Sequence, residues 1–395
     1  MNAEQVLAAL ELGPIAAGLP FATIGGRQVT VATAWSAEAL AVAARRRSAL
    51  VVVTGGAGVT GAGAAGGDAG QAGAVGAGAA GAGAAGGDAG QAGAVGAGAA
   101  GAEVVTPAGS GGAGRPWPIV AVTTSPWIAR AADLGLLVGA TGPADHDGLD
   151  EATAAALVVT FLDLAFDGAP RPPTSTRSLL ELVPFGIDSS YAGAEVLEAI
   201  VDGGRWVEFD AGSASEIRTG VARIGGRSVG VAVSEAGVER GVLSRAGVAR
   251  VERLVRWCEA GPDGGRPLVS LVDTDGAEPW DDAAGALALR DAVTALRRSA
   301  VVKVAVVMGR AVGLGATVLG AVGARADLVL PWPRARFGLT SADAAGASGS
   351  AWAAAREADV VDLVNPDDTR GRIAEALELF RGARCYAEPG EEDGS

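Results

Sequence analysis

Apolar and polar positions along the chain follow two periodicities, one typical of buried strands and the other typical of amphipathic helices. Near the start, two β-rich runs flank Gly25-Gly26 within "PFATIGGRQVTVATA", which predicts a hairpin over 20–34. A short helix is predicted over 36–47, with Ser36 as its N-cap and arginines in its last turn. The run "SALVVVTGG" then predicts a buried strand that ends on glycines.

The later patterns predict strands and helices on both sides of a Pro-rich segment, "DGAPRPPTSTR", which is interpreted as a linker. Helices are predicted at 148–166, 192–204, 245–260, 281–299 and 366–382, and a second hairpin at Gly225-Gly226. Because strands alternate with helices, we expect an α/β fold with largely parallel strands. Both halves repeat the order hairpin, helix, strand, glycine turn, helix and strand, so we expect a duplicated fold.

One segment carries no such pattern. Residues 61–80, "GAGAAGGDAGQAGAVGAGAA", are repeated without change at 81–100, and seventeen of the twenty residues in each copy are Gly or Ala. This composition has little to bury and a high conformational entropy, so a poorly ordered insertion is expected. The predicted organisation is an N-terminal domain over 1–170 with a Gly/Ala-rich insertion at 57–115, a C-terminal domain over 171–385 and an acidic tail over 386–395.

Composition narrows the class of protein. The chain has 395 residues, 49% of them hydrophobic, and a formal net charge of −14. That charge disfavours nucleic acid as a partner. The two cysteines, Cys258 and Cys385, cannot form a zinc ribbon and suit a reducing compartment. The best candidate for a membrane span, 311–332, is interrupted by charged residues. We therefore expect a soluble, cytoplasmic protein with no membrane or nucleic-acid partner.

Two strand-to-helix turns are rich in glycine and poor in reactive side chains. A strand that ends on small residues and opens a helix presents main-chain N–H groups, which can hold a developing oxyanion. The two turns are Gly313-Leu314-Gly315 and Gly55-Gly56-Ala57. They predict chemistry in which the main chain stabilises an enolate, although close packing of secondary-structure elements explains such glycine turns as well.

Several motifs occur in a familiar order between about 178 and 382. They include "GVARIGGRSVGVAVSE", "PLVSLVDTDG", "VVKVAVVMGRAVGLGATVL", "ARADLVLPWPRARFGL" and "VVDLVNPDDTRGRIAEAL". This part of the chain resembles the C-terminal domain of acyl-CoA carboxylase carboxyltransferase subunits of the propionyl-CoA carboxylase β type, which belong to the crotonase-like superfamily. The first half is similar in outline, through "TIGGRQVTV" and "LVVVTGGAGV", but "PIVAVTTSPWIARAADLGLLV" lacks the glycine pair of the corresponding family motif.

The resemblance implies a crotonase-like fold of two related halves and a carboxyltransferase activity. It implies transfer of a carboxyl group from carboxybiotin to the α-carbon of a coenzyme A thioester, without a metal in this chain. By position, Leu314 and Gly315 match the C-half oxyanion dipeptide, which holds the ureido oxygen of biotin. Gly55, Gly56 and Ala57 are matched to the N-half turn, which holds the thioester enolate.

The resemblance also implies substrate preference and partners. Thr317 falls where the family sets acyl-chain preference. Biotin is carried by a biotin carboxylase or biotin carboxyl carrier subunit, and the carboxyltransferase subunit forms a homo-oligomer, a hexamer being one such arrangement. The sequence departs from the family in Gly-Leu-Gly at 313–315 and in Gly58-Val59 after the N-half turn. A non-catalytic carboxyltransferase-like subunit with an assembly or regulatory role is therefore the alternative.

Two other functions make different demands on the sequence. A crotonase-type hydratase or hydrolase would need a carboxylate beside a glycine turn, and the "GAGVTG" run would need a following helix to bind a dinucleotide. The remaining candidate residues are interpreted as structural: His146 as a solvated loop residue, Asp273 and Asp275 as turn acceptors rather than metal ligands, Arg253 and Arg256 as a solvated helix face, and Cys258 and Trp332 as core residues.

Overall fold

The computed structural model describes residues 3–10, 21–24, 26–34, 36–46, 48–54, 118–184, 186, 189–261, 264–279, 282–323, 326–356 and 363–384. All of them belong to one compact unit, formed by Met1–Gly56 with Val105–Ser395. The Gly/Ala repeat, the turn Gly55-Gly56-Ala57 and the acidic tail lie outside the described residues. The domain boundaries drawn from the sequence stay predictions.

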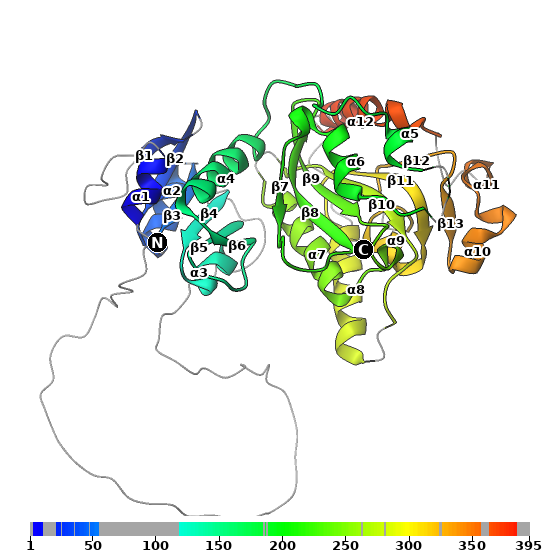
Figure 1. Cartoon of the computed structure of the whole chain (residues 1–395), viewed down its shortest axis with the longest axis horizontal. Coiled ribbons are helices and arrows are strands. Elements are labelled where there is room, and N and C mark those ends of the chain that lie inside the picture. The colour runs from blue at the N-terminus through cyan, green and yellow to red at the C-terminus, as the bar shows by residue number, and fades with distance from the viewer. Residues whose placement is uncertain are drawn as a thin grey trace, which may run out of the picture. The chain divides into compact units, whose positions relative to one another are not determined.

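The N half contains a six-stranded sheet in the order β1-β2-β3-β4-β5-β6 (Figure 1). Its first two strands form an antiparallel hairpin, as the sequence predicts, and the following pairs are parallel. The strands are β1 (Phe21–Ile24), β2 (Arg27–Ala32), β3 (Ala49–Val53), β4 (Ile119–Thr123), β5 (Leu134–Val138) and β6 (His146–Leu149). β3, β4 and β5 are buried along their whole length, which is why they read as continuous apolar runs.

Helices cover both faces of this sheet. The helices are α1 (Ala3–Ala9), α2 (Ala37–Arg46), α3 (Pro126–Ala131) and α4 (Glu151–Leu164). Because successive side chains of a strand point to opposite faces, Val51 and Val53 join the cluster with α1 and α4, whereas Leu50 and Val52 join the cluster with α2. Ser36 caps α2 through Ala39 N–H, as predicted.

The C half contains a seven-stranded sheet in the order β12-β11-β10-β9-β8-β7, with β13 paired to β11. Its strands are β7 (Trp206–Phe209), β8 (Ile217–Ile224), β9 (Arg227–Ser234), β10 (Leu268–Thr274), β11 (Lys303–Val312), β12 (Leu328–Pro331) and β13 (Arg336–Gly338). β7, β8 and β9 are antiparallel and β9 to β12 are parallel. Gly225 and Gly226 have φ of 61° and 84°, so the predicted β8–β9 hairpin turns where glycine permits it.

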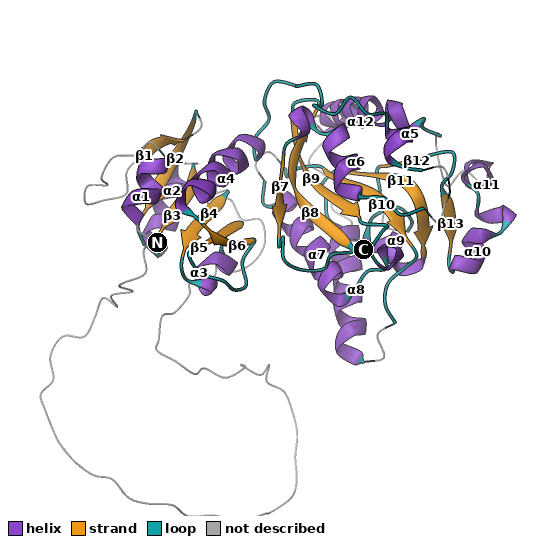
Figure 2. Ribbon diagram, in the orientation of Figure 1, coloured by secondary structure: helices purple, strands orange, loops and turns teal. Residues whose placement is uncertain are grey.

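This sheet is also covered on both faces (Figure 2). α7 and α8 contribute to one hydrophobic cluster, and α6 and α12 contribute to the other. The helices are α5 (Leu179–Leu182), α6 (Gly193–Ile200), α7 (Arg245–Glu259), α8 (Ala283–Arg298), α9 (Gly313–Val318), α10 (Ser341–Ala345), α11 (Ala351–Arg356) and α12 (Thr369–Arg384). Within the described residues, no helix is both long and apolar enough to cross a bilayer.

The two halves have equivalent topology, which confirms the predicted duplication. β1 to β5 and β8 to β12 follow the same order, with one antiparallel hairpin and then parallel neighbours. α2 and α7 each follow the second strand of their hairpin, and α3 and α9 each follow the central strands β4 and β11. The β4–α3 turn is therefore the topological counterpart of the β11–α9 turn.

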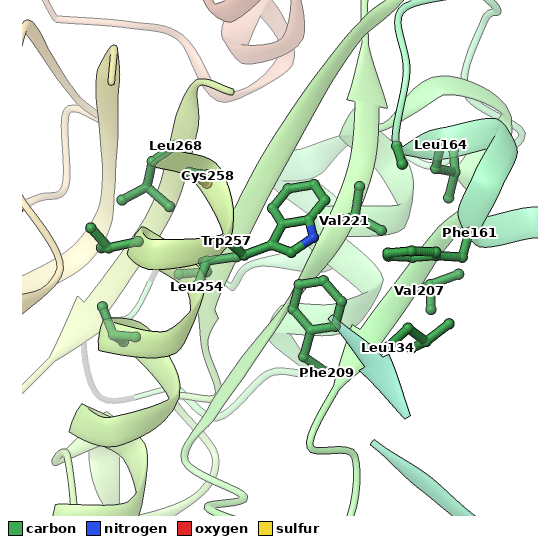
Figure 3. Packing of buried hydrophobic residues seen from close by; sticks show 14 of the residues in the cluster. Leu134, Phe161, Leu164, Val207, Phe209, Val221, Leu254, Trp257, Cys258 and Leu268 are labelled. Carbon is green, nitrogen blue, oxygen red and sulfur yellow. The ribbon is translucent and has the colours of Figure 1, made fainter. Parts of the chain in front are cut away.

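Aromatic packing joins α4 of the N half to β7 and α7 of the C half (Figure 3). The ring centroids of Phe161 and Phe209 lie 6.2 Å apart, and those of Phe209 and Trp257 lie 5.5 Å apart. Tilted and edge-on contacts at these distances stabilise aromatic pairs beyond the area they bury. Residues of both halves thus contribute to one hydrophobic cluster.

Candidate functional site

The turn between β11 and α9 is formed by a fully buried strand that runs directly into a short helix. All ten residues of β11 are buried, and Val312 occupies the N-cap position of α9. Gly313 has φ of 54°, a conformation that favours glycine. The first N–H groups of a helix have no partner within the helix. The turn therefore lies at the carboxyl end of a parallel strand and opens a helix at Gly313, and the use of these N–H groups as donors to a ligand stays a prediction.

A second loop fixes the first turn of α9 in place. A Cβ atom added to Gly315 would lie 2.2 Å from the carbonyl oxygen of Gly276, so the two backbones are in closer contact than any side chain allows. Thr274 holds that loop, because its hydroxyl is 2.6 Å from the carbonyl oxygen of Gly241 and accepts from Gly276 N–H at 3.1 Å. The loop after β10 therefore packs against the candidate dipeptide Leu314-Gly315.

The side chains at the turn are uncharged. Leu314 is 53% exposed and Leu339, whose carbonyl oxygen would lie 3.0 Å from a Cβ on Gly313, is 84% exposed. The hydroxyl of Thr317 donates to the carbonyl oxygen of Gly313 at 3.3 Å, so Thr317 is engaged within its own helix. An apolar rim around main-chain donors suits a neutral carbonyl group that gains negative charge during reaction.

Beneath the turn lies a buried ion network centred on Asp273, which is 0% exposed. Its Oδ1 accepts from the main-chain N–H of Arg310 at 2.8 Å and lies 3.2 Å from Arg310 Nε. Its Oδ2 accepts from the hydroxyl of Tyr191 at 2.8 Å and lies 3.6 Å from the guanidinium of Arg334. Burial, followed by the charge of Asp273, raises the pKa of Tyr191 well above 10.0, so the phenol stays protonated.

The neighbouring carboxylate of Asp275 is also paired. It contacts Arg240 and lies 3.2 Å from Arg310 Nε. Asp273 and Asp275 were interpreted as acceptors within their own turn, but their carboxylates contact residues that are distant in the sequence. Among the described residues, no group of three or more His, Cys, Asp and Glu could hold a metal ion. Sequence reasoning did not find the arginines of this network. An arginine within an otherwise apolar run, as at position 310, was the available signal.

The counterpart turn in the N half is built differently. α3 begins at Pro126, which has no N–H to donate, at the position that Gly313 occupies in α9. Its next residue, Trp127, takes the place of Leu314 and is 77% exposed. Ser125 N–H is already bonded to the hydroxyl of Thr123 at 2.9 Å. The β4–α3 turn therefore offers fewer main-chain donors than the β11–α9 turn.

A second polar cluster, which the sequence did not predict, lies where α7 meets the N half. Arg253 forms ion pairs with Asp145 and Asp210 and donates to the carbonyl oxygen of Asp133 at 3.2 Å. Arg130 adds a 3.0 Å ion pair with Asp210. Burial opposes the charged guanidinium, but the two carboxylates hold the pKa of Arg253 above its usual value. The interpretation of Arg253 as part of a solvated helix face is wrong, because its side chain is only 28% exposed and is paired with two carboxylates from outside α7.

Three other residues bear on the sequence interpretation. His146 is half-buried at the start of β6, with Nε2 2.9 Å from the carbonyl oxygen of Glu208, and is not a solvated loop residue. Cys258 is a core residue, as interpreted, and burial raises the pKa of its thiol to about 12. Trp332 is also in the core and donates its indole N–H to the hydroxyl of Thr369 at 2.9 Å.

A cavity of about 490 Å³ adjoins the Arg253 cluster rather than the glycine turn. Its lining includes Arg130, Pro143, Asp147, Leu149 and Ser213. The lining charges are mixed in sign, and Arg130 is paired with Asp210. The glycine turn, in contrast, has an open apolar rim, and chemistry there requires a second surface to exclude water.

Comparison with known proteins identifies similar chains. A family model described as a carboxyl transferase domain matches residues 137–377. The methylmalonyl-CoA carboxyltransferase 12S subunit of Propionibacterium freudenreichii subsp. shermanii is 28% identical over 236 residues, which cover 52% of this chain and 44% of that protein. The mitochondrial propionyl-CoA carboxylase beta chain of Mus musculus is 25% identical over 227 residues, which cover 52% of this chain and 41% of that protein. The chain thus spans less than half the length of these relatives.

Solved structures show the same fold. A crystal structure of the transcarboxylase 12S hexamer with hydrolysed methylmalonyl-coenzyme A superposes with a TM-score of 0.60 at 22% identity, covering 70% of this chain and 67% of that chain. A single-chain, multi-domain long-chain acyl-CoA carboxylase gives a TM-score of 0.55 at 20% identity, covering 66% of this chain and 33% of that chain. These likenesses confirm the predicted crotonase-like α/β fold.

Proposed function

Because the chain belongs to the carboxyl transferase domain family, we propose that it is the carboxyltransferase component of a biotin-dependent acyl-CoA carboxylase. The observation that carries the proposal is the position of the β11–α9 turn. This turn lies inside the matched residues 137–377 and opens a helix on main-chain donors without a charged side chain. The substrates are a coenzyme A thioester and carboxybiotin supplied by a partner subunit.

The residues of the turn stabilise negative charge on a carbonyl oxygen. The N–H groups of Leu314 and Gly315 donate to that oxygen, and one such donor in a water-poor site changes the rate by about 10²- to 10³-fold. Carboxybiotin supplies both the carboxyl group and, once that group has left, a basic ureido nitrogen that takes the α-proton of the thioester while the α-carbon bonds the carboxyl carbon. Thr317 contributes to acyl-chain preference from the second turn of α9.

The turn is suited to such a group by its chemistry. The ureido and thioester carbonyls are neutral before reaction, and the exposed side chains beside the donors, Leu314 and Leu339, are apolar. Apolar surroundings strengthen the hydrogen bonds that form as charge develops. Gly55, Gly56 and Ala57 remain the proposed N-half turn.

A partner and a second copy complete the proposed complex. A homo-oligomer, with a hexamer as in transcarboxylase 12S, would supply the second surface that the open β11–α9 turn lacks. A biotin carboxylase or biotin carboxyl carrier subunit would bring the carboxyl donor. We expect the complex to be cytoplasmic, and mass photometry of the purified chain tests the oligomer directly.

The experiment measures transfer of a labelled carboxyl group from malonyl-CoA or methylmalonyl-CoA to biocytin, which is the reverse of the proposed reaction. Wild-type chain is expected to form labelled carboxybiocytin, and a Gly315→Ala variant is expected to form far less. Absence of transfer with both thioesters, from correctly assembled wild-type protein, contradicts the proposal.

The second candidate is a non-catalytic subunit, and the β4–α3 turn favours it. At this N-half counterpart of the candidate site, Pro126 removes one main-chain N–H, and the exposed indole of Trp127 stands where the C half has Leu314. Such a subunit would co-purify with a biotinylated protein yet give no transfer. A hydratase or hydrolase is disfavoured, because Asp273 and Asp275, the carboxylates of the ion network beside the turn, are both paired with Arg310. Turnover of an enoyl-CoA without biotin would support a hydratase or hydrolase instead.

A further inference from the structure

The strand that carries the candidate turn is irregular just before it reaches the turn. β10 and β11 pair in register up to Val272 and Val307, and pairing resumes at Thr274 and Ala311. One residue of β10 therefore faces three residues of β11. Such a bulge bends the strand and leaves main-chain groups without a ladder partner.

Asp273 is the single β10 residue opposite this bulge, and its carboxylate fills it. Oδ1 accepts from the main-chain N–H of Arg310 at 2.8 Å, in place of a carbonyl of the neighbouring strand. A Cβ atom on Gly309 would lie 2.1 Å from Oδ2, so glycine is required for the carboxylate to approach. Arg334 also contacts this bulge, since its Nε donates to the carbonyl oxygen of Met308 at 2.8 Å.

The bulge ends at Arg310, three residues before Gly313, so a change in its geometry displaces the turn. Only Ala311 and Val312 separate the amide of Arg310 from the first residue of α9. Both are buried and belong to the strand, so they leave little freedom between the two points. A shift at position 310 therefore moves the N–H groups at 313–315.

We propose that Asp273 is a positioning residue that sets the direction of the Gly313–Gly315 N–H groups through the bulge in β11. The inference rests on the proposed function, because it assigns a role in that reaction. Asp273 does not touch substrate and acts through Arg310. Tyr191 and Arg334 hold the carboxylate in the orientation in which Oδ1 faces the amide.

Two substitutions separate this role from a general role in folding. Asp273→Asn keeps an acceptor for the Arg310 amide but removes the charge that pairs with the guanidinium groups. Asp273→Ala removes both. We expect both variants to lose stability, because buried arginines lose their counter-charge. Only the alanine variant should lose turnover, by about 100-fold, since an error of about 1 Å at reacting groups has that effect.

The chain offers a matched control in Asp202. This buried aspartate accepts from the main-chain N–H groups of Gly225 and Gly226 at 3.0 and 2.7 Å and pairs with Arg370 at 2.8 Å. Asp202 therefore holds main-chain N–H groups of the β8–β9 hairpin, as Asp273 holds a main-chain N–H group of the bulge. Asp202→Ala is expected to lose stability yet keep the turnover and KM of the wild type at temperatures where it is folded.

The experiment combines carboxyl transfer to biocytin with hydrogen–deuterium exchange of the full chain. Asp273→Ala should exchange faster over 303–318 and show lower kcat with unchanged KM for the thioester, whereas Asp273→Asn should keep both near wild type. Unchanged exchange over 303–318 in Asp273→Ala overturns the inference. If the wild type transfers no carboxyl group, the proposed function fails and the exchange result alone decides the positioning role.

A milder variant covers the case in which Asp273→Ala does not fold. Tyr191→Phe removes the hydroxyl that holds Oδ2 and keeps the ring that lies under Arg334. It should raise exchange over 303–318 and lower kcat to a smaller extent than the alanine variant. Wild-type exchange in that segment would overturn the inference in the same way.

Discussion

The contact between Gly315 and the carbonyl of Gly276 makes one substitution especially informative. Gly315→Ala places a Cβ atom 2.2 Å from that oxygen and 2.5 Å from its carbon. An ordinary C···O contact is about 3.3 Å, so the first turn of α9 must move by about 1 Å. The obstacle is backbone on both sides, and no flexible side chain can move aside.

The sizes of the expected losses in stability and in turnover follow from this contact. Overpacking of this kind destabilises by about 1–3 kcal/mol, offset in part by the roughly 0.5–1 kcal/mol by which alanine is favoured over glycine in a helix. We therefore expect a small net loss of stability. Turnover should fall by about 100-fold, because the displaced amides of Leu314 and Gly315 are the proposed donors.

The assay compares Gly315→Ala with Gly371→Ala, which makes the same chemical change in α12. No atom lies within 4 Å of a Cβ added to Gly371, so that variant should gain about 0.5–1 kcal/mol. Urea unfolding and carboxyl transfer to biocytin are measured for both. If Gly315→Ala gains as much stability as Gly371→Ala and keeps wild-type turnover, the turn is neither packed nor used as argued.

Other predictions concern stability. Because the pKa of Cys258 is about 12 when folded and 9.0 is its ordinary value, the unfolded chain loses this proton first as pH rises. Stability should therefore fall between these values by up to about 1.4 kcal/mol per pH unit, and urea unfolding of Cys258→Ala should lack that part of the decline. Arg253→Ala should cost about 3–5 kcal/mol by leaving the buried carboxylate of Asp145 without its cation, whereas Arg256→Ala, at an exposed ion pair, should cost at most about 1 kcal/mol in the same urea titration. Trp332→Phe should lower the free energy of unfolding by about 1–3 kcal/mol, because the Thr369 hydroxyl loses its buried donor, and Thr369→Val in the same background should add little.

The sequence predicts those elements whose local chemistry is sufficient to define them. Glycine pairs mark both hairpins, because Gly26, Gly225 and Gly226 adopt positive φ that other residues avoid. Long apolar runs mark the buried parallel strands. α10 and α11 were not predicted, since they are short and rich in small residues without a clear apolar face.

The candidate site also has one part that the sequence predicts and one part that it does not. The β11–α9 turn was predicted, because glycines between an apolar strand and a helix are visible locally. The support beneath it was not, because Asp273 meets Tyr191 across 82 residues of chain and Arg310 across 37. Arg253 was misread for the same reason: an amphipathic pattern shows that a cation lies off the apolar stripe, but does not show a buried carboxylate contributed by a distant loop.

The Arg253 cluster has a practical consequence for dissecting this protein. A cut in the Pro-rich segment at 167–177 would separate Arg253 from Asp145 and leave each fragment with an ionised group that was packed against its opposite charge. Phe161 would also be exposed to water on one fragment, and Phe209 with Trp257 on the other. Expressed separately, the fragments should therefore aggregate or stay partly unfolded, and co-expression in one cell should recover soluble material.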